Sequence, residues 1–107
     1  KGRILMMEGR REEAVQPLSQ LTELEPENID ACFSLSVCHK HLRQHDQAIQ
    51  AGEKVAQAQP GRIANLINLA DSYRVTGQMD RARELTQKAL KLEPENPSAR
   101  KLSELIG

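Results

Sequence analysis

The side chains with the most chemical potential in this chain are two cysteines and three histidines, all between positions 32 and 45. Cys38, His41 and His45 follow an i, i+3, i+7 spacing, which could bring a thiol and two imidazoles to one side of a helix. Thiolate and imidazole are ligands that zinc prefers, and a cysteine beside histidines could also act as a nucleophile next to its base. The spacing therefore raises two possibilities, a metal site and a nucleophilic centre.

Neither possibility has the context that it needs. A structural zinc site usually takes four ligands, and the helix is expected to end after His41 and to turn before His45. Residues that are neighbours in a helical sequence need not face each other, so spacing alone does not pair a nucleophile with a base. The sequence also lacks a glycine-rich phosphate loop. We therefore expect a protein that is not an enzyme and that has no metal site and no cofactor.

The two cysteines are expected to remain thiols. Cys32 and Cys38 lie six residues apart on one predicted helix, which separates them by about 9 Å along the axis. A disulfide needs Cα atoms within roughly 7 Å. Unbridged thiols favour a reducing compartment.

Composition excludes several classes of partner. The 107 residues carry 15 basic and 15 acidic side chains, so the formal net charge is zero and no positive field attracts nucleic acid. No stretch approaches the roughly 20 apolar residues of a membrane span, so membrane insertion is not expected. Because the chain opens within a predicted helix, we interpret it as a fragment of a longer protein.

A 34-residue period organises the chain. The same residue types recur at this interval, namely Pro26, Pro60 and Pro94, and Ala14, Ala48 and Ala82. A fixed period of this length is typical of stacked repeats. Apolar or small residues at helical spacing then predict two helices per period, carried by residues 1–8, 14–24, 29–42, 45–58, 66–73 and 82–92, and a last helix over 97–106. Gly9 and Gly77 are expected at turns between paired helices, and Asn28 and Asn96 to cap the helices that follow them.

The repeated residues resemble the tetratricopeptide repeat, a helix–turn–helix unit of 34 residues. The third unit carries the resemblance best, with Leu66, Leu69-Ala70, Tyr73, Gly77, Ala82, Ala89 and Pro94. The resemblance implies an all-α, right-handed solenoid of three helix pairs, the first truncated, and a C-terminal capping helix. The implied divisions are a partial first repeat over 1–28, a second over 29–62, a third over 63–96 and a capping helix over 97–107.

The second unit departs from the family pattern at two positions. Arg43 replaces the turn glycine, so this turn is expected to be strained or differently shaped, at a cost of roughly 1–2 kcal/mol if it is left-handed. Gly52 stands where the family usually has an aromatic residue. Either Val55 fills the space beside it, or the glycine lets a neighbouring side chain or a partner come close. We expect the second unit to be the least stable of the three.

In this family the first helix of each pair lines a concave face that holds peptides or partner helices. The resemblance places the partner-binding residues, position by position, at Arg3, Met6, Met7, Asp30, Phe33, Val37, Lys40, His41, Ile67, Asn68, Asp71, Arg74 and Lys101, with Ala64 and Ser98 also facing the groove. Phe33, Val37 and Ile67 would give apolar contact. Some of these residues could instead pack on the adjacent pair.

Some family members bind a C-terminal carboxylate with a clamp of Lys and Asn side chains. Here only Asn68 fits that pattern, because Phe33 and Ile67 occupy a lysine-type position. Binding of that kind is therefore disfavoured.

Three functions remain open at this stage. The favoured one is a scaffold that binds a protein or peptide in the concave groove. The first alternative is self-assembly, in which a second copy covers Ile4, Leu5 and Met6 on the truncated first repeat. The second alternative is a regulatory or positioning segment of a larger enzyme, or of a secretion or pilus-assembly protein.

Overall fold

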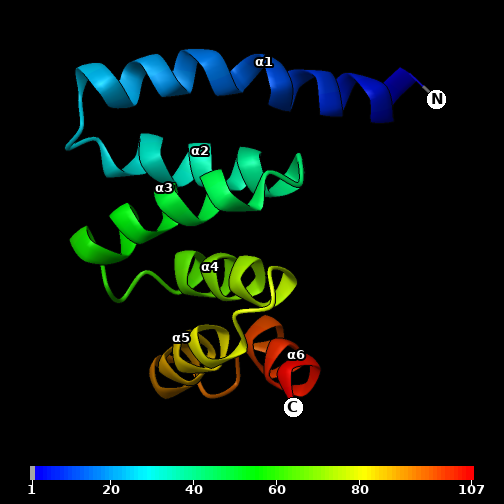
Figure 1. Cartoon of the computed structure of the whole chain (residues 1–107), viewed down its shortest axis with the longest axis vertical. Helices are drawn as coiled ribbons and strands as arrows, with labels where there is room; N and C mark the ends of the chain where they lie inside the picture. Colours follow the sequence, from blue (N-terminus) through cyan, green and yellow to red (C-terminus); the bar gives the residue numbers. More distant parts are fainter. Residues whose placement is uncertain (1) are drawn as a thin grey trace.

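The structure is a computed structural model that describes the backbone of residues 2–107 and the side chains of residues 13–107. The described chain contains six helices and no strand, which confirms the predicted all-α class. The helices are α1 (Gly2–Leu24), α2 (Ile29–His41), α3 (His45–Ala58), α4 (Ile63–Val75), α5 (Met79–Leu92) and α6 (Pro97–Ile106). They follow one another as a stack from one end of the molecule to the other (Figure 1). No helix in this part of the chain combines the length and the hydropathy that crossing a bilayer requires.

The 34-residue period sets where the helices begin. Helices α2, α4 and α6 start at Ile29, Ile63 and Pro97, each 34 residues after the last. Asn28 and Asn96 cap the first and last of these, because their Oδ1 atoms accept hydrogen bonds from N–H groups three residues on, at 3.1 and 3.0 Å. This satisfies donors that a helix start leaves unpaired.

The predicted turn at Gly9 is wrong, because α1 continues through this residue. A glycine in a helix costs only about 1 kcal/mol relative to alanine. The preceding residues 1–8 would make about two turns, too short for an independent helix. Continuing α1 through Gly9 adds a backbone hydrogen bond for each residue instead. The structure therefore has one long helix where a truncated pair was expected.

The contacts between helices define an inner side of the stack. Consecutive helices pack on each other from α1 to α6, and in addition α2 contacts α4 and α4 contacts α6. Within residues 2–107, α3 makes no such contact with α1 or with α5. The even-numbered helices are thus drawn together while the odd-numbered ones are spread apart. A stack with this pattern is concave on the side of α2, α4 and α6.

Small residues allow this close packing. One core cluster joins Leu66, Ala89 and Ala99, and a second joins Leu69, Tyr73 and Ala82. Four of the fully buried positions are alanines with no exposed surface, Ala70, Ala82, Ala89 and Ala99. The chain therefore builds its core between helices rather than around large aromatic side chains.

Arg43 keeps the turn geometry of the family without its glycine. Its φ is 62°, close to the 86° of Gly77 one period later. The backbone bonds also correspond, because Gln44 N donates to His39 O at 2.8 Å, as Gln78 N donates to Tyr73 O at 2.8 Å. The turn is therefore strained rather than differently shaped, which was the first of the two expectations from the sequence.

Replacing Arg43 by glycine should therefore stabilise the chain. We expect Arg43→Gly to raise the free energy of unfolding by about 1 kcal/mol, because glycine has no Cβ atom and adopts the left-handed conformation without a steric penalty. The reverse change one period later, Gly77→Arg, should lower it by a similar amount. Urea unfolding followed by circular dichroism measures both, and a loss of stability in Arg43→Gly would contradict the strain.

Gly52 brings α4 close to α3. A methyl group built on Gly52 would lie 2.9 Å from Leu69 Cδ1, inside any normal contact distance. In addition, Asn65 Nδ2 donates to the carbonyl oxygen of Gly52 at 3.0 Å in a buried hydrogen bond. The space beside the glycine is thus used by a neighbouring side chain, as one of the two sequence interpretations expected.

This contact predicts a coupling between two positions. Gly52→Ala alone should show none of the roughly 1 kcal/mol gain in helix stability that alanine normally brings, because the methyl group displaces Leu69. In a Leu69→Val background, which removes the Cδ atoms, the same change should stabilise the chain by about 1 kcal/mol. A double-mutant cycle from chemical unfolding measures this coupling. Equal effects in both backgrounds would show that the contact is unimportant.

Candidate functional site

Four predicted groove residues form one polar network across α2 and α4. Lys40 Nζ on α2 lies 3.3 Å from Asp71 Oδ2 and donates to Asn68 Oδ1 at 3.2 Å. Arg74 reaches the other carboxylate oxygen, with Nη2 at 2.8 Å and Nε at 3.1 Å from Asp71 Oδ1. All four residues are half-buried. Two cations therefore share one carboxylate, which leaves a local excess of positive charge.

The network sets the protonation of Asp71. Burial on its own would raise the pKa of this carboxyl, but the hydrogen bonds and charges of Arg74 and Lys40 together outweigh burial and hold the pKa below its usual value of 3.8. Asp71 is therefore ionised at neutral pH, and its charge holds α2 to α4.

Phe33 is half-buried on the same face, but Arg62 covers it. The guanidinium carbon of Arg62 lies 4.2 Å from the centre of the Phe33 ring, which is a cation–π contact. Its Nη1 atom also donates at 2.9 Å to both Asp30 Oδ1 and Gln59 Oε1. Arg62 is not among the groove residues predicted from the sequence. Its place in the period is a signal, because Asn28 and Asn96 cap helices at the equivalent positions, whereas an arginine side chain cannot accept the capping hydrogen bond.

The other predicted groove residues are distributed unevenly. Val37 is half-buried, whereas His41 and Lys101 are exposed. Ile67 is only partly a groove residue, because it packs against the core cluster of Leu66, Ala89 and Ala99. The contact is possible because α6 covers this side of α4. The predicted groove residues Arg3, Met6 and Met7 lie outside the described side chains.

A cavity of about 360 Å³ opens between α4 and α6 at the turn that precedes α6. Its lining is Ile63, Ala64, Ile67, Asn68, Glu93, Asn96 and Ser98. The volume is in the range of small-ligand sites. Four of the predicted groove positions, at 64, 67, 68 and 98, meet here.

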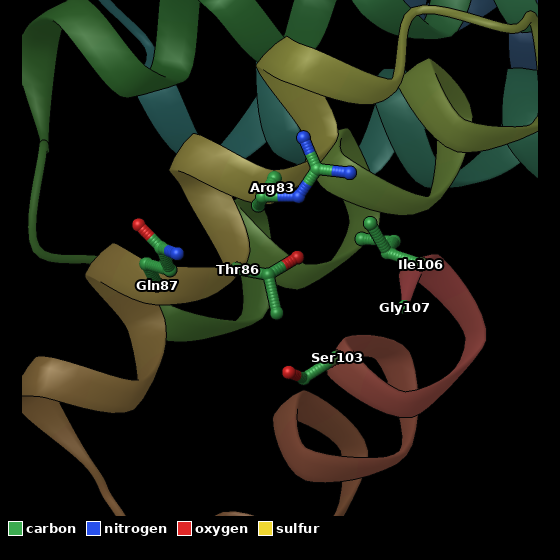
Figure 2. Close-up of a pocket in the computed structure, with 6 residues that line it drawn as sticks. All are labelled: Arg83, Thr86, Gln87, Ser103, Ile106 and Gly107. Atoms are coloured by element: carbon green, nitrogen blue, oxygen red, sulfur yellow. The ribbon is translucent and has the colours of Figure 1, made fainter.

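Apart from an open hollow of about 430 Å³ beside Leu90, Pro94 and Arg100, two further cavities lie away from this face. One of about 310 Å³ lies beside α1, α2 and α3, where Cys32, Leu35 and His39 contribute to its lining. Figure 2 shows the other, of about 80 Å³, where Thr86 and Arg83 of α5 approach Ser103 of α6. This second cavity is smaller than typical ligand sites, and the Thr86 hydroxyl is already bonded to Ala82 O at 2.7 Å.

The cysteine and histidine group is dispersed. Cys32 is buried and Cys38 is half-buried, and no disulfide links them. His39 is also half-buried, and its Nδ1 lies 2.7 Å from Gln44 Oε1. Among the residues with described side chains, no three His, Cys, Asp or Glu groups are arranged to hold a metal ion.

A second polar cluster joins α3, α4 and α5 outside the groove. The Tyr73 hydroxyl donates to Glu53 Oε2, and Arg81 Nη1 lies 3.9 Å from the same oxygen. Burial, and then the hydrogen bond to Glu53, raise the pKa of Tyr73 to about 12. The phenol stays protonated at neutral pH, so this cluster joins consecutive helices and offers no nucleophile.

The Asp71 network makes stability depend on pH. Because the folded pKa is below the unfolded value, ionised Asp71 stabilises the fold above about pH 4, and this contribution is lost as the pH falls through the folded pKa. We expect Asp71→Asn to lower the free energy of unfolding by about 1 kcal/mol at pH 7, and by less at pH 3. Asp80→Asn is the matched control, because Asp80 is fully exposed beside Arg83. Urea unfolding at the two pH values tests this. An equal loss of unfolding free energy in Asp71→Asn at pH 7 and at pH 3 would argue against the network.

Comparison with known proteins gives a consistent result. Two models of the tetratricopeptide repeat family match the chain, over residues 41–106 and 1–63. The tetratricopeptide repeat-containing protein trd-1 of Caenorhabditis elegans is 30% identical over 97 residues. The alignment covers 91% of this chain and 13% of that protein, so the chain corresponds to a small part of its relative.

Solved structures show the same fold. The first tetratricopeptide repeat domain of Spaghetti (RPAP3), bound to the HSP90 peptide SRMEEVD, superposes with a TM-score of 0.87 at 16% identity, covering 99% of this chain and 84% of that one. MamA from Desulfovibrio magneticus RS-1 gives a TM-score of 0.87 at 23% identity, covering 98% and 59%. At these identities the likeness concerns the fold alone.

Proposed function

Because the chain belongs to the tetratricopeptide repeat family, we propose that it is a non-enzymatic scaffold that binds a protein or peptide. The bound segment, extended or helical, lies along the inner face of α2, α4 and α6. The observation that carries the proposal is the contact pattern of the helices, in which, over residues 2–107, only these three are drawn together on one side. Such surfaces typically hold peptides or amphipathic helices.

The inner face combines apolar and charged groups. Val37 and part of the Phe33 ring offer apolar surface beside the Lys40, Asp71 and Arg74 network. Since Lys40 and Arg74 share one carboxylate, an acidic group of a ligand can add to the network without displacing it. Charge of this kind orients a ligand and speeds its association more than it adds affinity. An amphipathic segment with acidic side chains fits this arrangement.

The Spaghetti domain supports a peptide as the ligand, because its structure contains one. The way of binding is expected to differ. The clamp of Lys and Asn side chains is mostly missing here, and the Oδ1 atom of its one candidate, Asn68, already accepts a hydrogen bond from Lys40. Apolar contact and the network on α2 and α4 replace the clamp in this proposal.

Two substitutions test the inner face. Phe33→Asp and Lys40→Glu should each weaken capture of the partner at least tenfold, because the first removes the apolar contact and the second reverses the charge. Their matched controls are Leu92→Asp and Lys88→Glu on α5, both exposed. Partner capture followed by calorimetry with the purified partner gives the affinities, and circular dichroism checks the helix content. Normal binding by both inner-face variants would exclude this groove.

Self-assembly remains the alternative predicted from sequence. The residues on which it depends, Ile4, Leu5 and Met6, lie outside the described side chains. Sedimentation equilibrium over a wide range of concentration separates the two functions, because a monomer at every concentration excludes assembly.

A further inference from the structure

The inner face contains two equivalent slots. The first lies between α2 and α4 and the second between α4 and α6. Each slot is built from the same four positions of the repeat, 34 residues apart. The positions Asp30, Phe33, Gln59 and Arg62 of the first slot correspond to Ala64, Ile67, Glu93 and Asn96 of the second.

The first slot is filled by the chain itself. Arg62 lies over the ring of Phe33, 4.2 Å from its centre, and donates to Gln59 Oε1 and Asp30 Oδ1 at 2.9 Å. Arg62 is half-buried. The apolar floor and the polar wall of this slot thus accommodate a guanidinium group.

The second slot is open because Asn96 does not fill it. Asn96 Oδ1 accepts from Ala99 N at 3.0 Å, and its Nδ2 donates to Glu93 Oε1 at 2.9 Å. Both ends of this short side chain are engaged in the turn. What remains is the cavity of about 360 Å³ whose lining includes Ile63, Ile67 and Glu93.

We infer that the second slot binds an arginine side chain of the partner peptide, in the manner in which Arg62 occupies the first. Ile63 and Ile67 provide the apolar floor for the aliphatic stem. Glu93 occupies the position equivalent to Gln59, whose amide oxygen accepts a hydrogen bond from Arg62. The carboxylate of Glu93 would accept the same bond and also carries a negative charge that complements a guanidinium group. This inference rests on the proposed function, because it names one side chain of the bound segment.

Three features of the site could oppose a cation. Lys40 donates to the lining residue Asn68 at 3.2 Å, but Asp71 lies 3.3 Å from the same ammonium group. The first turn of α6 carries the positive end of a helix dipole. However, Arg62 is itself the N-cap residue of α4, so the first slot holds a guanidinium at the same kind of helix end. Lys101 lies further along α6, is exposed, and is not part of the cavity lining. Among the described side chains, Glu93 is the single charged group that lines the cavity.

The slot can be tested with the side chain alone. N-acetylarginine methylamide is titrated into the ¹⁵N-labelled chain, and the amide shifts are followed by NMR. N-acetylcitrulline methylamide is the matched probe, because it has the same shape without the charge. We expect saturable shifts concentrated at Ala64, Ile67, Glu93 and Ser98 with arginine and weak or no shifts with citrulline.

Three variants assign the effect to the slot. Glu93→Gln should lower the affinity for the arginine probe about three- to fivefold, as expected for a partly exposed ion pair. Ala64→Asp places a carboxylate at the position equivalent to Asp30 and should raise this affinity by a similar factor. Glu104→Gln on the exposed side of α6 should change nothing. Equal shifts from the two probes, or an arginine affinity unaffected by Glu93→Gln, would overturn the inference.

The same data separate this inference from the proposed function. If Phe33→Asp no longer binds the partner and the arginine probe does not bind the unchanged chain, the groove assignment is supported and the arginine slot is wrong. If the probe binds as expected while Phe33→Asp and Lys40→Glu keep the partner, the slot exists and the groove assignment is wrong.

Discussion

The contact between Gly52 and Leu69 fixes the relation between the second and third units, on which the rest of the fold depends. A helix of a solenoid is held only by its neighbours, so a single close approach sets how far one unit lies from the next. Here α4 reaches α3 because Gly52 has no side chain, and the buried bond from Asn65 to its carbonyl oxygen holds the two helices at this separation. The distance between α2 and α4 follows, and with it the reach of Lys40 to Asp71.

Departures from the repeat are concentrated in the second unit and at its boundary, and they have different consequences. Arg43 adopts a left-handed conformation that glycine would adopt without strain, so the turn keeps its shape at a cost in stability. Arg62 leaves α4 without a side-chain cap, yet it covers Phe33 and binds Asp30 across the inner face. The first departure weakens a turn, whereas the second converts a capping position into part of a surface.

The inner face is therefore partly occupied before any partner arrives. In the first slot a guanidinium covers an aromatic ring, and beside it one carboxylate serves two cations. Further along, where the repeat supplies Ile67 and Glu93 without an arginine, a cavity remains. Repetition explains this contrast, because equivalent positions share a backbone geometry while their side chains differ. An occupied position in one unit then indicates what an open position in the next can accept.

The sequence by itself determined the architecture. Every unit must lie against the next in the same way, so the 34-residue spacing indicated stacked helix pairs, and Asn28 and Asn96 indicated two caps correctly. The sequence also identified the face on which Lys40, Asn68, Asp71 and Arg74 meet, although their use as a binding site remains a prediction. Only the tertiary structure showed that α1 continues through Gly9, that Ile67 joins the core, and that Arg62 covers Phe33. These features depend on side chains and helices brought together from different units, and a local pattern carries no information about which of them will touch.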